Sequence, residues 1–474
     1  MRKLPAFLLA CMLCLLFVCP SAAADPEGGS VLVSGNYEYI LQGNGTAVIT
    51  RYTGNADVLV IPGQLGGAPV SALGEKSFSR CSSLLDVTIP EGITSVGDYA
   101  FLYCTGLAAV FMPDSLTDIG RNPFTACSAL ADIIVSDDHP ALLFEDGVLF
   151  SRQDHRLVTF TAARPRGPYT VPDEVRTIGA SAFYTCTNLT ELALPDSVTA
   201  IGQKAFGLCV SMSSVRLPDS IDYIGASAFF GCRGLHTLSV PASVTSIAEK
   251  TFEDCTSLRE ITLPDTVTSV GSRAFADCAA LESIELPPRI REISDGSFAG
   301  CAGLARISLP GKVTRIGDNA FLDCVNLESI DIPSGVRSVG AGAFSGCSGL
   351  REISLPPECG DIGPGAFRSC FALVSFRVPE SVEIIPEEMF AGCTALAEVF
   401  IPSGVRSIGA RAFLACGQLA EIRIPDTVRF IGEHVFFECR NLVRVSLPDP
   451  PADIHPEAFG QYENSSGASP DAVP

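Results

Sequence analysis

Hydrophobic residues recur along this chain at a fixed spacing. Phenylalanine marks the period at positions 78, 101 and 124, and then at every 23rd position from 183 to 459. Proline keeps the same spacing from Pro172 to Pro448 without an insertion or deletion. A repeat of this kind is the signature of a solenoid, in which each copy packs against its neighbours. About sixteen units are present, and the only longer step, of 59 residues, separates Phe124 from Phe183.

Each unit combines two patterns. In one copy, Leu258-x-x-Ile261-x-Leu263-Pro264 alternates at period two, which predicts a short strand that the proline ends. The apolar residues that follow are spaced by three, four, one and three, which is typical of a compact helical or 3₁₀ turn. In the same copy they are Val267, Val270, Ala274, Phe275 and Cys278. A glycine precedes most of the phenylalanines by four residues. Because Pro386 takes that place in one copy, we attribute the glycine to lack of room rather than to a positive φ.

One strand and one compact return stretch within about 20–29 residues is the pattern of a leucine-rich repeat. We therefore predict a leucine-rich-repeat solenoid with a parallel β-sheet on its concave face and short helical or 3₁₀ turns on the return side. The alternative is a right-handed parallel β-helix, which would need period-two segments around the whole rung. The stretch Ala274-Phe275-x-x-Cys278 does not supply them.

The N-terminal residues differ from the repeats. Arg2 and Lys3 precede an apolar run, and Ala22-Ala23-Ala24 forms an A-x-A cleavage pattern, so residues 1–24 are predicted to be a signal peptide. No later apolar stretch reaches the roughly 18 residues of a membrane span. We therefore expect a secreted protein, extracellular or loosely associated with the cell surface.

The regions that flank and interrupt the repeats give the domain boundaries. Tyr37 to Tyr52, with Gly43-Asn44-Gly45 at its middle, predicts a β-hairpin within an N-terminal cap of residues 25–60. The solenoid is assigned to residues 61–462, followed by a polar, disordered tail of residues 463–474.

One repeat is replaced by residues 137–171, which contain a second predicted hairpin. The hairpin is either a solenoid unit with a modified return loop or a projecting recognition element.

Composition narrows the function classes. The chain carries a net charge of −21 and is 47% hydrophobic, with no tryptophan and five histidines. A strongly acidic surface repels phosphate, which argues against nucleic acid and anionic lipid as partners. The histidines are scattered, and Asp137-Asp138-His139 is a single short cluster that is more typical of a solvated turn than of a metal site. We expect no catalytic residues, metal or cofactor.

Cysteine is the feature most open to misinterpretation. Sixteen cysteines remain after residue 24, and fifteen of them stand three residues after a repeat phenylalanine. Side chains stacked in parallel do not reach disulfide geometry easily, and a 23-residue spacing matches no zinc pattern. We therefore expect a ladder of buried thiols, with Cys359 as a substitution in the core.

The outward side chains of the strands are the remaining candidate site. The positions two and four residues before each proline point away from the core and vary from unit to unit. Large apolar side chains with arginine neighbours are common interface anchors. The candidate binding residues are therefore Phe111, Ile134, Arg377, Phe400 and Arg423.

The repeat unit Leu-x-x-Ile-x-Leu-Pro-x-x-Val-x-x-Ile-Gly-x-x-Ala-Phe-x-x-Cys resembles the BspA-like leucine-rich repeats of secreted bacterial and protist surface proteins. The resemblance covers about residues 31–462. It implies a leucine-rich-repeat solenoid and an adhesin-like role in binding a host or neighbouring-cell protein.

The function predicted from these observations is non-enzymatic protein binding through the concave sheet. A passive structural surface protein without a specific ligand is the alternative. An enzyme with a site at the interrupted unit is disfavoured because no acid–base pair is marked.

Overall fold

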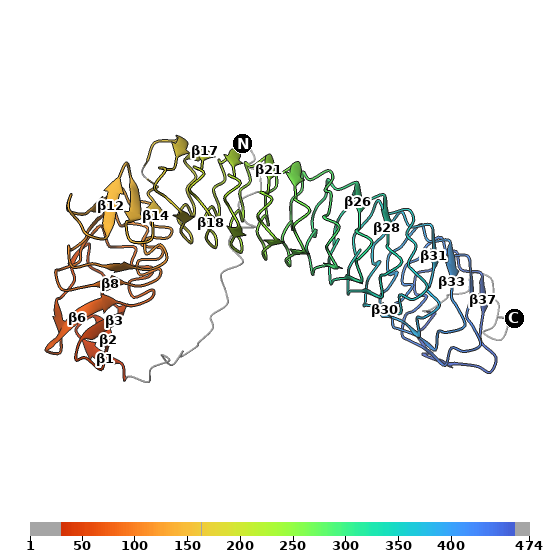
Figure 1. The fold of residues 1–474 in the computed structure, drawn as a ribbon. Coiled ribbons are helices and arrows are strands. Elements are labelled where there is room, and N and C mark those ends of the chain that lie inside the picture. The colour runs from red at the N-terminus through yellow and green to blue at the C-terminus, as the bar shows by residue number, and fades with distance from the viewer. Residues whose placement is uncertain (1–29, 163, 460–474) are drawn as a thin grey trace, which may run out of the picture.

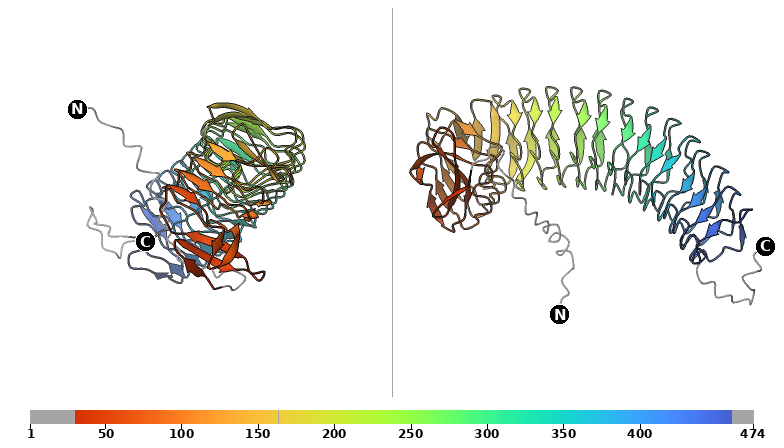
Figure 2. Two further views of the ribbon diagram at one scale, coloured as in Figure 1. Left: turned by 90° about the vertical axis from the view of Figure 1, so that its left-hand side faces the viewer. Right: turned by 90° about the horizontal axis from the view of Figure 1, so that it is seen from below.

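The computed structural model describes residues 30–162 and 164–459, which form one long curved solenoid (Figure 1). The N-terminal described rungs, in red, and the C-terminal described rungs, in blue, lie at opposite ends of the arc, and the rungs follow one another in sequence order between them (Figure 2). The predicted signal peptide and the predicted C-terminal tail lie outside the described residues. The fold is therefore a parallel-strand solenoid built from the 23-residue unit.

The predicted strand before the proline is present in nearly every rung. We call these elements the Pro strands. They are β4 (Val58–Val60), β7 (Asp86–Thr88), β9 (Ala109–Phe111), β11 (Asp132–Ile134), β15 (Gly167–Thr170), β17 (Leu189–Ala193), β19 (Ser214–Arg216), β21 (Thr237–Ser239), β23 (Glu260–Thr262), β26 (Arg306–Ser308), β28 (Ser329–Asp331), β31 (Ser375–Arg377), β33 (Glu398–Phe400), β35 (Glu421–Arg423) and β37 (Arg444–Ser446). They form a series of short parallel sheets, within which neighbours pair in register, as Leu238 does with Ile261. Near the C-terminal end, β31 pairs with β33 and β35 pairs with β37.

A second series of parallel strands, which the sequence analysis did not predict, precedes the glycine position of the unit. We call these elements the Gly strands. They are β6 (Ala68–Leu73), β8 (Ser95–Val96), β10 (Asp118–Ile119), β14 (Arg156–Phe160), β16 (Thr177–Ile178), β18 (Ala200–Ile201), β20 (Tyr223–Ile224), β22 (Ser246–Ile247), β24 (Ser269–Val270), β25 (Glu292–Ile293), β27 (Arg315–Ile316), β29 (Ser338–Val339), β30 (Asp361–Ile362), β32 (Ile384–Ile385), β34 (Ser407–Ile408), β36 (Phe430–Ile431) and β38 (Asp453–Ile454).

The predicted helical return side is wrong: the described residues contain hydrogen-bonded turns there and no helix. Around Phe275, the N–H groups of Ala274 and Ala276 bond three residues back, whereas the N–H of Phe275 itself bonds across to Ser297 in the next rung. Arg273 and Asp277, two residues on either side of Phe275, have φ values of 55° and 61°. This left-handed backbone is incompatible with a helix, so the segment alternates between local and cross-rung bonds.

The core is a continuous stack of the repeated apolar side chains. Phe275 is fully buried, and its ring centroid lies 5.4 Å from that of Phe252 and 5.6 Å from that of Phe298. The interplanar angles are 10° and 8°, so the rings stack from rung to rung. Each rung thus buries its apolar side against two neighbours, as a solenoid requires.

The first residues of the solenoid are covered by antiparallel strands. β2 (Tyr37–Leu41) pairs with β3 (Ala47–Tyr52) over the predicted hairpin, and β1 (Leu32–Ser34) pairs with β2. β3 then runs parallel to β6, which also pairs with the short β5 (Gln64–Leu65). Tyr52 continues the aromatic stack, since its ring centroid lies 5.4 Å from that of Phe78.

The interrupted unit is built into the solenoid. β12 (Leu142–Glu145), β13 (Val148–Ser151) and β14 are antiparallel neighbours, and β14 continues in parallel into β16. Every residue of β13 is buried. Its side chains divide between two hydrophobic cores: Val148 belongs to the core that continues to residue 458, and Leu149 to the core of the N-terminal rungs. The hairpin is therefore a wall between two cores, which favours a modified solenoid unit over a projecting element.

Candidate functional site

The outward face of the Pro strands is defined by the strict alternation of exposed and buried side chains. In β23, Glu260 and Thr262 are exposed and Ile261 is buried, and most Pro strands repeat this pattern. Because the backbone is held by neighbouring rungs, the outward side chains form columns with regular spacing. We call these columns the Pro-strand face.

Three of the predicted residues lie near the C-terminal end of this face. Arg377 and Phe400 are register partners on β31 and β33, and the guanidinium carbon of Arg377 lies 4.1 Å from the ring centroid of Phe400. This is a cation–π contact. Phe400 is 48% exposed, so part of its ring remains open to solvent. Arg423 holds the equivalent position on the next strand, β35.

The charges around Phe400 differ from those of the chain as a whole. The outward positions of β31, β33, β35 and β37 carry three arginines and two glutamates, whereas the whole chain has a net charge of −21. Glu421 lies 3.1 Å from Arg444 in an ion pair. Within the described residues, no ion pair or hydrogen bond of the Arg377 or Arg423 side chain is present. These two guanidiniums are therefore available to a partner.

The other two predicted residues lie together in the opposite arm of the solenoid. Phe111 and Ile134 are register partners on β9 and β11, and Phe111 is 44% exposed. β4 extends the same column with Val60, and Val58 is exposed beside it. Sequence reasoning missed these two valines because their proline, Pro62, lies off the 23-residue spacing, although it follows them at the usual distances.

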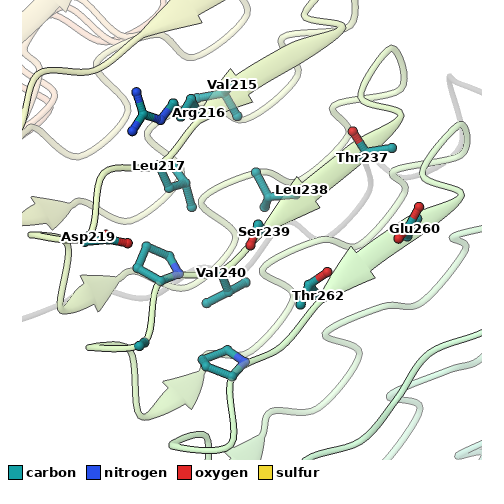
Figure 3. A pocket seen from close by; sticks show the side chains of 13 residues that line it. Val215, Arg216, Leu217, Asp219, Thr237, Leu238, Ser239, Val240, Glu260 and Thr262 are labelled. Carbon is teal, nitrogen blue, oxygen red and sulfur yellow. The ribbon is translucent and has the colours of Figure 1, made fainter.

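A broad groove lies on the Pro-strand face between these two groups (Figure 3). It has a volume of about 710 Å³ and spans β19, β21 and β23. Its floor carries the hydroxyls of Thr237, Ser239 and Thr262, and charged Arg216 and Glu260 border it. The described residues that line it include no histidine or cysteine. It is a surface depression suited to contact.

The cysteines form a ladder of buried thiols, as the sequence analysis predicted. All sixteen in the described residues are free, and all but Cys81 are buried. Burial raises the pKa of the Cys209 and Cys324 thiols to about 12. Since the thiolate is the nucleophile and the metal ligand, these side chains supply neither at neutral pH. Their role is packing.

Two histidines, His139 and His434, lie near side chains that could ligate a metal, and the ring nitrogens of both make close polar contacts. Asp137 and Asp138 form the expected exposed turn, whereas His139 is buried. Its Nε2 lies 3.0 Å from the Pro113 carbonyl oxygen, and its Nδ1 accepts the N–H of Ala141. Of the described residues, Glu433, His434 and Glu457 form the one group of three with ligand-capable atoms close together. The two ring nitrogens of His434 face different carboxylates: Nδ1 lies 3.1 Å from Glu433 and Nε2 lies 3.2 Å from Glu457.

Comparison with known proteins identifies the family. The model of the BspA-type leucine-rich repeat region matches residues 67–142 and, in overlapping copies, residues 168–468. The chain therefore belongs to the BspA-type leucine-rich repeat family. No curated protein matches it significantly. Over the described residues, no helix is long and apolar enough to cross a membrane.

Two solved structures are similar to this chain, and the first of them agrees with this fold. A leucine-rich repeat protein from Bacteroides ovatus is 28% identical, with a TM-score of 0.52, over 85% of this chain and 99% of its own length. A leucine-rich cell surface protein from Faecalibacterium prausnitzii is 25% identical over 88% of this chain and 94% of its own, with a TM-score of 0.36.

Proposed function

We propose that this protein is a secreted, non-enzymatic binding protein that recognises a partner protein through the Pro-strand face, with Phe400 as its main anchor. The observation that carries the proposal is the Arg377–Phe400 contact. It places a large exposed ring and a stacked guanidinium, 4.1 Å apart, on two paired strands. Aromatic and arginine side chains are the residue types that dominate the energy of protein interfaces.

Rigidity supports the same site. Each Pro strand is fixed by its neighbours, so its outward side chains lose little additional freedom when a partner binds, and less of the contact energy is lost to ordering. The second apolar group, at Phe111 and Ile134, has the same support and extends the proposal to a second contact area.

Export is part of the proposal and rests on the predicted signal peptide of residues 1–24. The adhesin-like role comes from the family resemblance. A passive structural protein would share the same solenoid, but it would have no need for a large aromatic side chain left open beside two arginines that lack an ion pair.

Capture with matched variants tests the proposal. The chain without its predicted leader is immobilised and exposed to extracellular proteins of its natural environment, alongside Phe400→Ala and Phe430→Ala variants. Phe430 is the control because it is 45% exposed, nearly as much as Phe400, but lies on a Gly strand. A protein retained by the wild type and by Phe430→Ala but lost from Phe400→Ala supports the proposal. Equal retention by all three proteins contradicts it.

A further inference from the structure

We infer that the surface around Phe400 recognises an acidic helical segment, in which two carboxylates about 10 Å apart flank one apolar side chain. The inference rests on the proposed function and specifies the chemistry of the partner. It follows from the spacing, the pairing and the charge of three residues: Arg377, Phe400 and Arg423.

The spacing comes from the solenoid. Arg377, Phe400 and Arg423 occupy the same position in three successive rungs. The paired strands β31 and β33 lie about 4.8 Å apart. β35 belongs to the next rung and is not paired with β33, but the core rings of neighbouring rungs in this part of the solenoid lie 5.8 and 5.4 Å apart. The two arginine positions are therefore separated by about 10 Å, with the Phe400 position between them.

The side-chain contacts of Arg377 and Arg423 leave both guanidiniums open to an anion. Arg377 contacts the Phe400 ring, and a stacked guanidinium keeps its N–H edges free for a carboxylate. In the next rung, by contrast, Arg444 is already bound to Glu421. Glu421 is held in that ion pair, so Glu398 is the outward carboxylate of β33 and β35 that has no ion pair within the described residues. Glu398 lies on β33, the strand that also carries Phe400.

The charge distribution makes this area selective. An acidic partner is repelled by a chain of net charge −21 and gains attraction only where basic side chains predominate. The last four Pro strands provide such an area on the Pro-strand face, with three arginines against two glutamates. The groove near Arg216 does not, because Asp219 and Glu260 border it as well.

The separation of the two arginines favours a helix over an extended strand. In a helix, residues i and i+7 lie about 10.5 Å apart on one face, and i+3 or i+4 lies between them. In an extended strand, side chains on one face repeat at roughly 6.6 Å, which does not match the two arginines. The expected segment therefore carries Asp or Glu at i and i+7 and an apolar residue at i+3 or i+4.

Three designed helical peptides of equal length test the inference. The first carries Glu at i and i+7 and Leu at i+3, the second carries Gln in place of both Glu, and the third carries both Glu on the opposite face. We expect the first to bind the full chain at least tenfold more tightly than the other two, with an affinity that falls as salt increases. The Arg377→Gln, Arg423→Gln double variant should reduce its binding to the level of the Gln peptide. Arg216→Gln, which changes an exposed arginine elsewhere on the same face, should have no effect.

The outcomes separate this inference from the proposed function. Equal binding of the three peptides, no binding of the first, or no effect of the double variant overturns the acidic-helix inference. If Phe400→Ala still abolishes capture of a natural partner in that case, the binding function stands and only the partner chemistry is wrong.

Discussion

The thiol of Cys278 donates a hydrogen bond to the carbonyl oxygen of Phe252 in the preceding rung, with 3.2 Å between sulfur and oxygen. The same oxygen accepts the backbone N–H of Cys255. The ladder cysteines from Cys104 onward make the same kind of bond, so most of them fill a small buried site and satisfy an acceptor position of a buried carbonyl group. This relationship explains why a small side chain with a weak donor recurs at this place in the unit.

The first prediction concerns the number and reactivity of the thiols. Without reductant, the chain lacking its leader should give close to sixteen free thiols after denaturation, the number that the described residues contain. When folded it should give at most about one, since only Cys81 is partly exposed. Titration with a thiol reagent, with and without denaturant, measures both numbers. A count near zero in denaturant would show that the ladder is a set of disulfides.

The second prediction concerns alkaline pH. Burial raises the pKa of the Cys209 and Cys439 thiols from 9.0 to about 12. Above pH 9 the unfolded chain loses these protons while the folded chain keeps them, so the thiols contribute full stability below pH 9 and lose that contribution between about pH 9 and 12. Each such thiol lowers the free energy of unfolding by up to about 1.4 kcal/mol per pH unit.

The melting temperature measured from pH 8 to pH 11 checks this effect. We expect a steep fall above pH 9, and a shallower fall in a variant with Cys209→Ala, Cys232→Ala and Cys255→Ala. A melting temperature that stays constant to pH 11, or the same slope in both proteins, would contradict the pKa assignment.

The third prediction concerns the aromatic stack. Phe275→Ala should lower the free energy of unfolding by about 3–5 kcal/mol, because it removes a fully buried ring that stacks on Phe252 and Phe298. Phe371→Ala is the control, since that ring is 50% exposed, and it should change stability by less than about 0.5 kcal/mol. Chemical denaturation of the three proteins provides the measurement, and equal effects of the two substitutions would argue against an inward-facing Phe275.

The fourth prediction concerns the hairpin at the interrupted unit. Deleting residues 142–160 should prevent folding, because Val148 and Leu157 belong to one core and Leu149 and Val158 to the other. Circular dichroism and limited proteolysis would detect the loss. Replacing the exposed Gln153 and Asp154 in the turn by glycine is the control and should leave the fold intact. A deletion variant that folds with an unchanged melting temperature would show that the hairpin is peripheral.

Much of the rung could be predicted from the sequence because the repeat reveals the same packing many times. The Pro strand, the buried phenylalanine and the thiol ladder all follow from period and residue type. The reason for the glycine four residues before the phenylalanine was also predicted correctly. At Gly271 the φ is not positive, and a Cβ would lie 2.6 Å from the backbone nitrogen of Glu249. That distance leaves no room for a side chain without a shift.

The return turns were predicted wrongly for a physical reason. The spacing of Val267, Val270 and Ala274 fits a helix, but spacing alone does not show whether an N–H bonds within the rung or to the next one. The left-handed residues offered a signal, since glycine or aspartate often stands two residues after the phenylalanine, as Asp277 and Gly300 do. The pairing of Arg377 with Phe400 was predictable because the two residues hold the same position in neighbouring repeats, whereas the lack of an ion pair at Arg377 required the structure.

The account's central claim is that Phe400 on the Pro-strand face anchors a partner. The most direct test is the dissociation constant of the captured partner for the wild type, Phe400→Ala and Phe430→Ala, together with the three melting temperatures. We predict at least about tenfold weaker binding for Phe400→Ala, equivalent to about 1.4 kcal/mol, with less than about twofold change for Phe430→Ala and nearly equal melting temperatures. Unchanged affinity of Phe400→Ala, or an equal loss in both variants, would contradict the claim.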